Sequence, residues 1–73
     1  MDKGVFLDLL QESFQRKTPL AMDMLLADIP EWDSLTAMLM LAIAKQQFGK
    51  NMKITDLKKD MSIGDIYGLL MQP

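Results

Sequence analysis

The chain contains neither cysteine nor histidine, and this absence limits its fold more than any residue that is present. With 73 residues it can form one domain (1–73), and domains this small are commonly stabilised by disulfides or a structural metal. Disulfides are excluded here, and the usual zinc ligands are missing. The fold must therefore rely on apolar packing, for which 49% of the residues, including eight methionines, are suitable.

The same absence restricts the chemistry. A Ser-His triad and a cysteine nucleophile are both excluded, so we expect a binding or carrying module, not an enzyme, and no metal site. A net charge of -2 argues against nucleic-acid binding, which depends on basic residues that neutralise phosphates. The longest apolar run, 37–44, is far below the roughly 20 residues that span a bilayer. No signal peptide is evident, so we expect a cytoplasmic protein without a membrane span.

Helix caps and apolar spacing predict three main helices. The first begins after Asp2, a common capping residue, and has an apolar face made of Phe6, Leu9, Leu10 and Phe14. The second runs from 33–34 to about 48 and stops at Gly49. The last begins at Ser62, where Asp65 can complete a capping box, and its inward stripe is Ile63, Ile66, Tyr67 and Leu70.

Two further segments separate these helices. Residues 18–33 are predicted to form a long apolar connection, in which 22–26 can form one helical turn. Thr55 is expected to cap a short helix that contains Leu57. No segment alternates in the manner of a strand. The predicted fold is therefore all-α: a small four-helix bundle, with three main helices plus one short helix and a long loop between helices one and two.

The most distinctive segment is Glu31-Trp32-Asp33-Ser34-Leu35, at the start of the second helix. A serine at a helix N-terminus is exposed, and the unpaired N–H groups there favour a bound anion. From Asp33-Ser34 alone, however, Ser34 is an ordinary helix cap. Trp32 is expected to hold the long connection against the bundle.

This segment, with the elements around it, resembles the acyl and peptidyl carrier proteins of fatty acid, polyketide and nonribosomal peptide pathways. The resemblance covers nearly the whole chain in order: Asp28-Ile29-Pro30, Trp32-Asp33-Ser34-Leu35, Phe48-Gly49 and Ser62-Ile63-Gly64-Asp65-Ile66. It implies a single acyl-carrier-like domain in which Ser34 carries 4'-phosphopantetheine. A phosphopantetheinyl transferase attaches this arm from coenzyme A, using magnesium. Asp33 would match the acid close to that enzyme, and Leu35 the apolar residue that partners contact.

The second helix departs from typical fatty acid carriers, which have several acidic residues there. Residues 34–48 contain no acid and one cation, Lys45. Two apolar stripes follow the helix, and we assign the first to the core: Ala37, Met40, Leu41, Ala44 and Phe48. The second continues the line of Ser34 and is predicted to contact partner enzymes: Leu35, Met38, Leu39 and Ala42. Packing of Met38 and Leu39 under the long loop is the alternative, and Glu31, with Asp28 and Asp33, can guide the modifying enzyme.

Three functions stay open. The first is a monomeric acyl carrier protein that holds acyl intermediates as thioesters and passes them between the loading and processing enzymes of a fatty acid, polyketide or lipid-related pathway. The second is an aminoacyl or peptidyl carrier that works with an adenylating enzyme. The third, from a different class, is a small helical adaptor in which Ser34 is only a cap.

Overall fold

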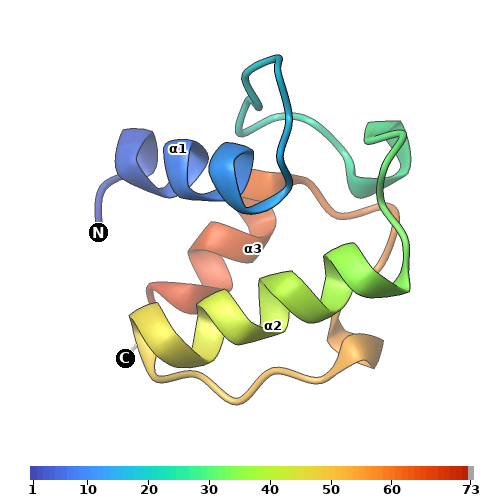
Figure 1. The fold of residues 1–73 in the computed structure, drawn as a ribbon. Helices are drawn as coiled ribbons and strands as arrows, with labels where there is room; N and C mark the ends of the chain where they lie inside the picture. Colours follow the sequence, from blue (N-terminus) through green and yellow to red (C-terminus); the bar gives the residue numbers. More distant parts are fainter. Residues whose placement is uncertain (73) are drawn as a thin grey trace.

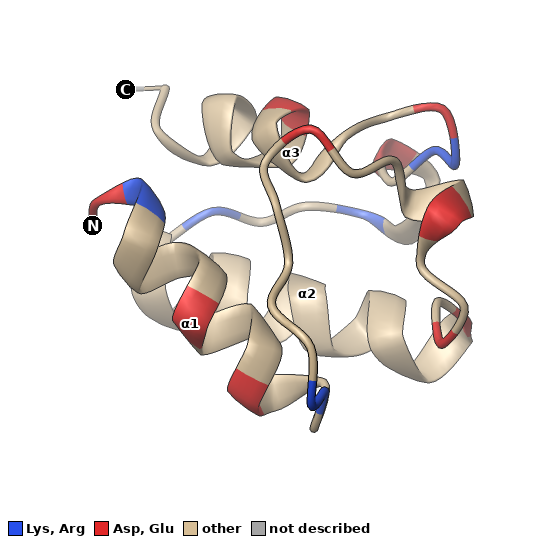
Figure 2. Ribbon diagram, turned by 90° about the horizontal axis from the view of Figure 1, so that it is seen from above, with Lys and Arg blue, Asp and Glu red and all other residues tan. Residues whose placement is uncertain are grey.

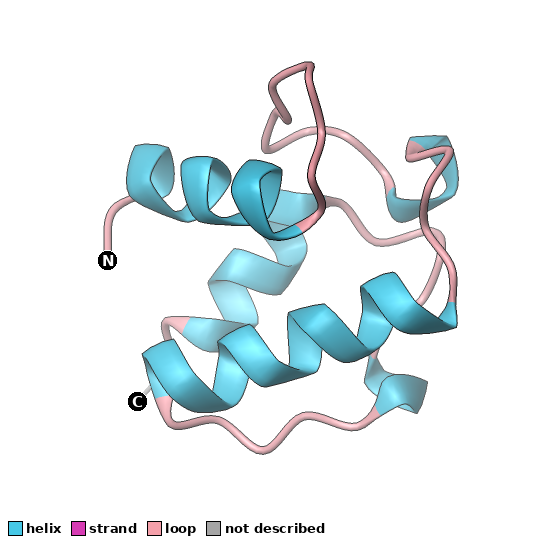
Figure 3. Ribbon diagram, viewed as in Figure 1, coloured by secondary structure: helices cyan, strands magenta, loops and turns pink. Residues whose placement is uncertain are grey.

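The computed structural model describes residues 1–72 and contains three α-helices and two short 3-10 helices (Figures 1 and 3). In chain order the elements are α1 (Lys3–Ser13), η1 (Leu26–Asp28), α2 (Ser34–Phe48), η2 (Ile54–Asp56) and α3 (Ile63–Leu70). No strand occurs within these residues, which confirms the all-helical class. The four-helix bundle is not confirmed, because the predicted fourth helix is only the single turn η2.

The capping residues fix the helix boundaries. Asp2 caps α1, which begins at Lys3. The Asp2 Oδ1 atom accepts a hydrogen bond of 2.8 Å from Val5 N. Ser62 and Asp65 cap α3 reciprocally, with bonds of 3.0 Å from Asp65 N to Ser62 Oγ and 2.9 Å from Ser62 N to Asp65 Oδ2. Gly49 ends α2 in the left-handed conformation, with φ of 67°. These predicted helix ends are confirmed.

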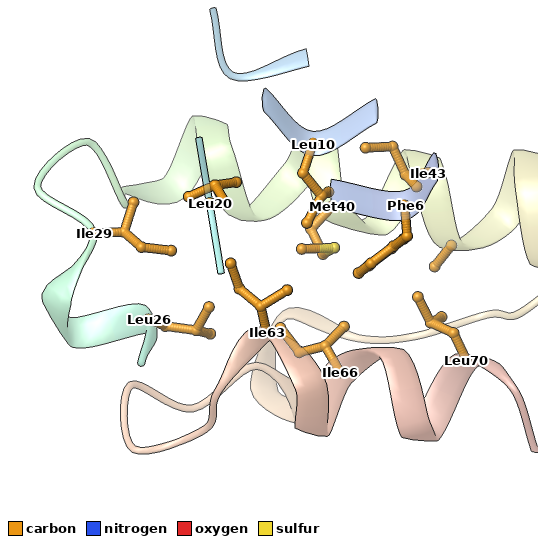
Figure 4. Close-up of a cluster of buried hydrophobic side chains, with 11 residues drawn as sticks. Phe6, Leu10, Leu20, Leu26, Ile29, Met40, Ile43, Ile63, Ile66 and Leu70 are labelled. Atoms are coloured by element: carbon orange, nitrogen blue, oxygen red, sulfur yellow. The ribbon is translucent and has the colours of Figure 1, made fainter. Parts of the chain in front are cut away.

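The core lies where the three α-helices face one another (Figure 4). Its largest fully buried side chains come from all three helices and from η1: Phe6, Leu10, Leu26, Met40, Ile63 and Ile66. The Phe6 ring contacts Phe48 edge-on at 5.9 Å between centroids and Tyr67 at 5.2 Å. The Tyr67 hydroxyl donates a hydrogen bond to Met1 O. The inward stripe predicted for the last helix is confirmed, because Ile63, Ile66 and Leu70 are buried and Tyr67 is half-buried.

The connection between α1 and α2 differs from the prediction at residues 22–26, which do not form a helical turn. Leu25 is extended and pairs with Ser62 in an isolated antiparallel bridge. Around it, backbone hydrogen bonds run from Leu26 N to Met61 O (2.9 Å), from Ile63 N to Met24 O (2.9 Å) and from Gly64 N to Met22 O (2.7 Å). Because backbone groups of residues 22–26 form hydrogen bonds with the 61–64 segment, they do not need a local helical turn to satisfy them. The helical turn of this connection is η1, at residues 26–28.

The prediction that Thr55 caps the short helix is also wrong. Thr55 lies inside η2, which begins after Lys53. Lys53 N donates a hydrogen bond of 2.9 Å to the Asp56 carboxylate, so an acid at the end of the turn satisfies the first backbone donor. Leu57 follows η2 directly. The chain after α2 runs back along that helix, and η2 packs beside α2 (Figure 1).

Candidate functional site

Asp33, and not Ser34, caps α2. The backbone of Asp33 is extended, and its Oδ1 accepts a hydrogen bond of 2.9 Å from Thr36 N. Ser34 is therefore the first residue of the helix, and its side chain is exposed. Within residues 1–72 the Ser34 hydroxyl takes part in no hydrogen bond. This hydroxyl has no capping role, so it is free to react with or bind another molecule.

Thr36 organises the turn that leads into α2. It is buried, and its Oγ1 lies 2.8 Å from Glu31 O and 3.1 Å from Asp33 Oδ1. The Thr36 N–H, followed by the Thr36 hydroxyl, holds the pKa of Asp33 below its ordinary value, since both stabilise the ionised carboxylate. Sequence reasoning missed this residue, although a threonine three positions after a capping aspartate is a local signal for such a bond.

Side chains of the connection hold the approach to α2 in place. The Arg16 guanidinium pairs with the Glu31 carboxylate and also bonds to Thr18. Trp32 is half-buried and meets Phe14 edge-on, with 6.1 Å between ring centroids and 76° between the planes. The expectation that Trp32 holds the connection against the bundle is confirmed. Glu31, predicted to guide a modifying enzyme, is exposed but already paired with Arg16.

Most residues of the predicted core stripe of α2 are buried, and most residues of the predicted partner stripe are exposed. Of the core stripe, Ala37, Met40 and Ala44 are buried, whereas Leu41 and Phe48 are half-buried. Of the second stripe, Leu35 is 67% exposed, Met38 is 57% exposed and Ala42 is exposed, whereas Leu39 is half-buried. Thr36 and Ile43 are also buried and belonged to neither predicted stripe.

Met38 therefore does not pack under the loop, whereas Leu39 lies at a hollow lined by the end of α1, including Ser13 and Phe14. Leu35, Met38 and Ala42 form an exposed apolar face beside Ser34, which we call the apolar face of α2.

Ser34 opens onto a hollow of about 430 Å³, which it shares with Trp32, Asp33, Ala37, Ile54, Leu57 and Lys59. A second hollow, of about 500 Å³, lies between the η2 region and α3 and does not include Ser34. It is lined by Met52, Thr55, Asp56, Lys58, Met61 and Leu69. The structure thus brings Asp33, Ser34 and the η2 segment together around one open space.

The described residues, 1–72, contain no group of three or more acidic, histidine or cysteine side chains that could hold a metal ion. No helix within the same range is long and apolar enough to cross a bilayer. Comparisons of the chain with protein-family models, with curated proteins and with solved structures found no match.

Proposed function

We propose that this protein is an acyl carrier protein whose Ser34 Oγ carries 4'-phosphopantetheine, and that it passes acyl thioesters between cytoplasmic enzymes of a fatty acid, polyketide or lipid-related pathway. One observation carries this proposal: the Ser34 hydroxyl is exposed and free of hydrogen bonds within residues 1–72, because Asp33 caps the helix in its place. A serine that capped α2 would lose a stabilising bond when esterified, whereas Ser34 would lose none.

The other two serines are less suited to this role. Ser13 is half-buried at the end of α1. Ser62 is half-buried and its hydroxyl accepts the bond from Asp65 N that begins α3. Ser34 is the one exposed serine of the three, so a modifying enzyme that requires serine would meet a single exposed serine hydroxyl.

The position of Ser34 also fits the charge of the attached group. The N-terminal end of a helix carries a partial positive charge, which favours a phosphodiester there. The Asp33 carboxylate accepts the Thr36 bonds, and the chain has no histidine, so activation of the hydroxyl falls to the modifying enzyme and its magnesium. When bound, the arm supplies a thiol that holds cargo as a thioester and brings it to each partner at high effective concentration.

In this proposal η2 takes the place of the short helix of a four-helix carrier bundle, and the apolar face of α2 contacts the partner enzymes. That face lies directly after Ser34, where an enzyme must bind to reach the arm. Because α2 contains no acidic residue, the contact depends on buried apolar area more than on charge.

The experiment is modification in vitro. The protein is incubated with coenzyme A, magnesium and a broad-specificity phosphopantetheinyl transferase, and its intact mass is measured. We expect a gain of one phosphopantetheine group in the wild type and in Ser13→Ala, but none in Ser34→Ala. The Ser34→Ala variant keeps the Asp33 cap, so its circular dichroism should match the wild type.

A folded wild type that gains no mass, or a Ser34→Ala variant that is modified equally, would contradict the proposal. In that case the apolar face of α2 would favour the small helical adaptor.

A further inference from the structure

The hollow beside Ser34 is built from two separate parts of the chain. One side consists of the approach to α2 and its first residues, and the other of η2 and the residues after it. The second part is held in place by the backbone, because Ala27 N donates a hydrogen bond of 3.1 Å to Lys59 O. A group attached to Ser34 therefore has a formed surface next to it.

The lining combines an apolar wall with one cation. Trp32 and Leu57 are half-buried, and Ile54 is 49% exposed, so the wall presents apolar surface to the open space. Lys59 also lines the hollow, and its ammonium group has no carboxylate within 4.0 Å, because the ion pair within residues 1–72 is the one between Arg16 and Glu31. Such a surface fits a ligand that joins an anionic group to an aliphatic chain.

The distribution of charge favours the same ligand. Residues 45–59 hold five of the eight cations and one acid, Asp56, although the whole chain has a net charge of -2. Figure 2 shows this as blue stretches along the chain between α2 and α3. On the Ser34 side of the hollow the charged residue is Asp33, whose carboxylate accepts the bonds from Thr36. Lys59 is therefore the group able to offset a second negative charge at Ser34.

We propose that this hollow holds the near part of the arm, with the Lys59 ammonium paired to the phosphodiester on Ser34 and the apolar wall against the aliphatic segment that follows. This inference rests on the proposed function, because it concerns the group attached to Ser34. It assigns Lys59 as a positioning residue and Trp32, Ile54 and Leu57 as the contact surface for the arm.

The test compares two neighbouring lysines. Lys59 lines the hollow of Ser34, whereas Lys58 lines the other hollow, so Lys59→Gln and Lys58→Gln remove the same charge from different sites. Each protein is first modified completely, which intact mass verifies. Amide shifts in ¹⁵N NMR spectra and thermal midpoints are then compared before and after modification.

In the wild type and in Lys58→Gln, we expect modification to shift the amides of residues 57 and 59 as well as those of 33–37, and to raise the thermal midpoint. In Lys59→Gln, the shifts at 57 and 59 and the rise in midpoint should be lost. Two results would overturn this inference and leave the proposed function standing. The first is complete modification with amide shifts confined to residues 33–37. The second is the same amide shifts and the same change in thermal midpoint in Lys59→Gln and Lys58→Gln. A wild type that gains no mass would overturn both.

Discussion

Replacing Thr36 by valine removes one hydroxyl from the turn before α2 and keeps the shape of the side chain. Thr36 is 7% exposed, and its Oγ1 lies 2.8 Å from Glu31 O and 3.1 Å from Asp33 Oδ1. A hydrogen bond within a protein contributes roughly 0.5–1.5 kcal/mol, so we expect Thr36→Val to lower the free energy of unfolding by about 1 kcal/mol. In a domain of this length that corresponds to a fall of roughly 4–8 °C in the thermal midpoint.

The same variant should change the titration of Asp33. The Thr36 hydroxyl is the second cause of the lowered pKa of Asp33, after the Thr36 N–H, which valine retains. The pKa of Asp33 should therefore rise part of the way toward its ordinary value. A carboxyl whose folded pKa is lowered stabilises the fold above its unfolded pKa, and this stabilisation is lost as the pH falls through the folded pKa. The stability difference between wild type and Thr36→Val should therefore narrow in acid.

Urea unfolding followed by circular dichroism, at neutral and acid pH, measures the stability difference, and ¹³C NMR of the Asp33 carboxyl measures its pKa. Thr36→Ser is the matched control, because it keeps the hydroxyl and loses one methyl group, worth about 0.8 kcal/mol when buried. In that control the pKa of Asp33 should stay low. If Thr36→Val were as stable as the wild type and Asp33 titrated unchanged, the assigned role of Thr36 would be refuted.

Three other predictions follow from the fold. Phe6→Ala should lose about 3–5 kcal/mol in chemical denaturation, because the ring is fully buried between Phe48 and Tyr67. Gly49→Ala should destabilise the protein by roughly 1–2 kcal/mol in thermal unfolding, because residue 49 has φ of 67°. Gly68→Ala should instead stabilise the protein by up to about 1 kcal/mol, because residue 68 lies inside α3 and alanine favours a helix more than glycine does. A Leu35→Gln, Met38→Gln double variant should change stability by no more than about 1 kcal/mol but weaken binding to a partner enzyme, measured by titration calorimetry.

Each of these has an outcome that contradicts it. A Phe6→Leu variant, which keeps most of the volume, should lose less than Phe6→Ala, and equal losses would show that volume is not the cause. The changes in stability of the two glycine variants should have opposite signs. Neither added Cβ would meet an atom within 4 Å, and of these two residues only Gly49 has a positive φ. Partner binding that collapses between low and moderate salt would show that charge, and not the apolar face of α2, controls the contact.

The beginnings of the helices could be predicted because their signals are local. Asp2, Asp33 and the Ser62–Asp65 pair each cap a helix through bonds to residues within three positions. What the local signal left open was which of two adjacent residues, Asp33 or Ser34, supplies the cap. Both are good capping residues, and the choice depends on the extended backbone of Asp33 and its bonds with Thr36.

The faces of α2 were harder to separate, because the helix is apolar nearly all round. Ile43 is buried although it belongs to neither predicted stripe. Thr36 is also buried, although it is polar and many other residues of α2 are apolar. Periodicity alone cannot choose between such faces, since the choice depends on where α1 and α3 pack. Exposure of Leu35 and Met38 nevertheless follows the predicted stripe.

The connection could not be predicted from local pattern, because its partners lie about forty residues away along the chain. Residues 22–26 bond to residues 61–64, and the close approach favours glycine at 64, where an added Cβ would lie 3.0 Å from Met22 O. Nothing in residues 22–26 themselves indicates that pairing. The same applies to the hollow beside Ser34, whose second wall comes from η2.

The bridge between Leu25 and Ser62 also has a consequence for how this protein folds. It closes a loop that contains all of α2 and η2, and closing a long loop has an entropic cost that rises with the logarithm of its length. α2 can form from local bonds in microseconds or less, but the surface beside Ser34 exists only after the distant segments have met. The isolated α2 segment would therefore present Ser34 without the hollow beside it. An enzyme that recognises both Ser34 and the hollow would act only on the folded chain.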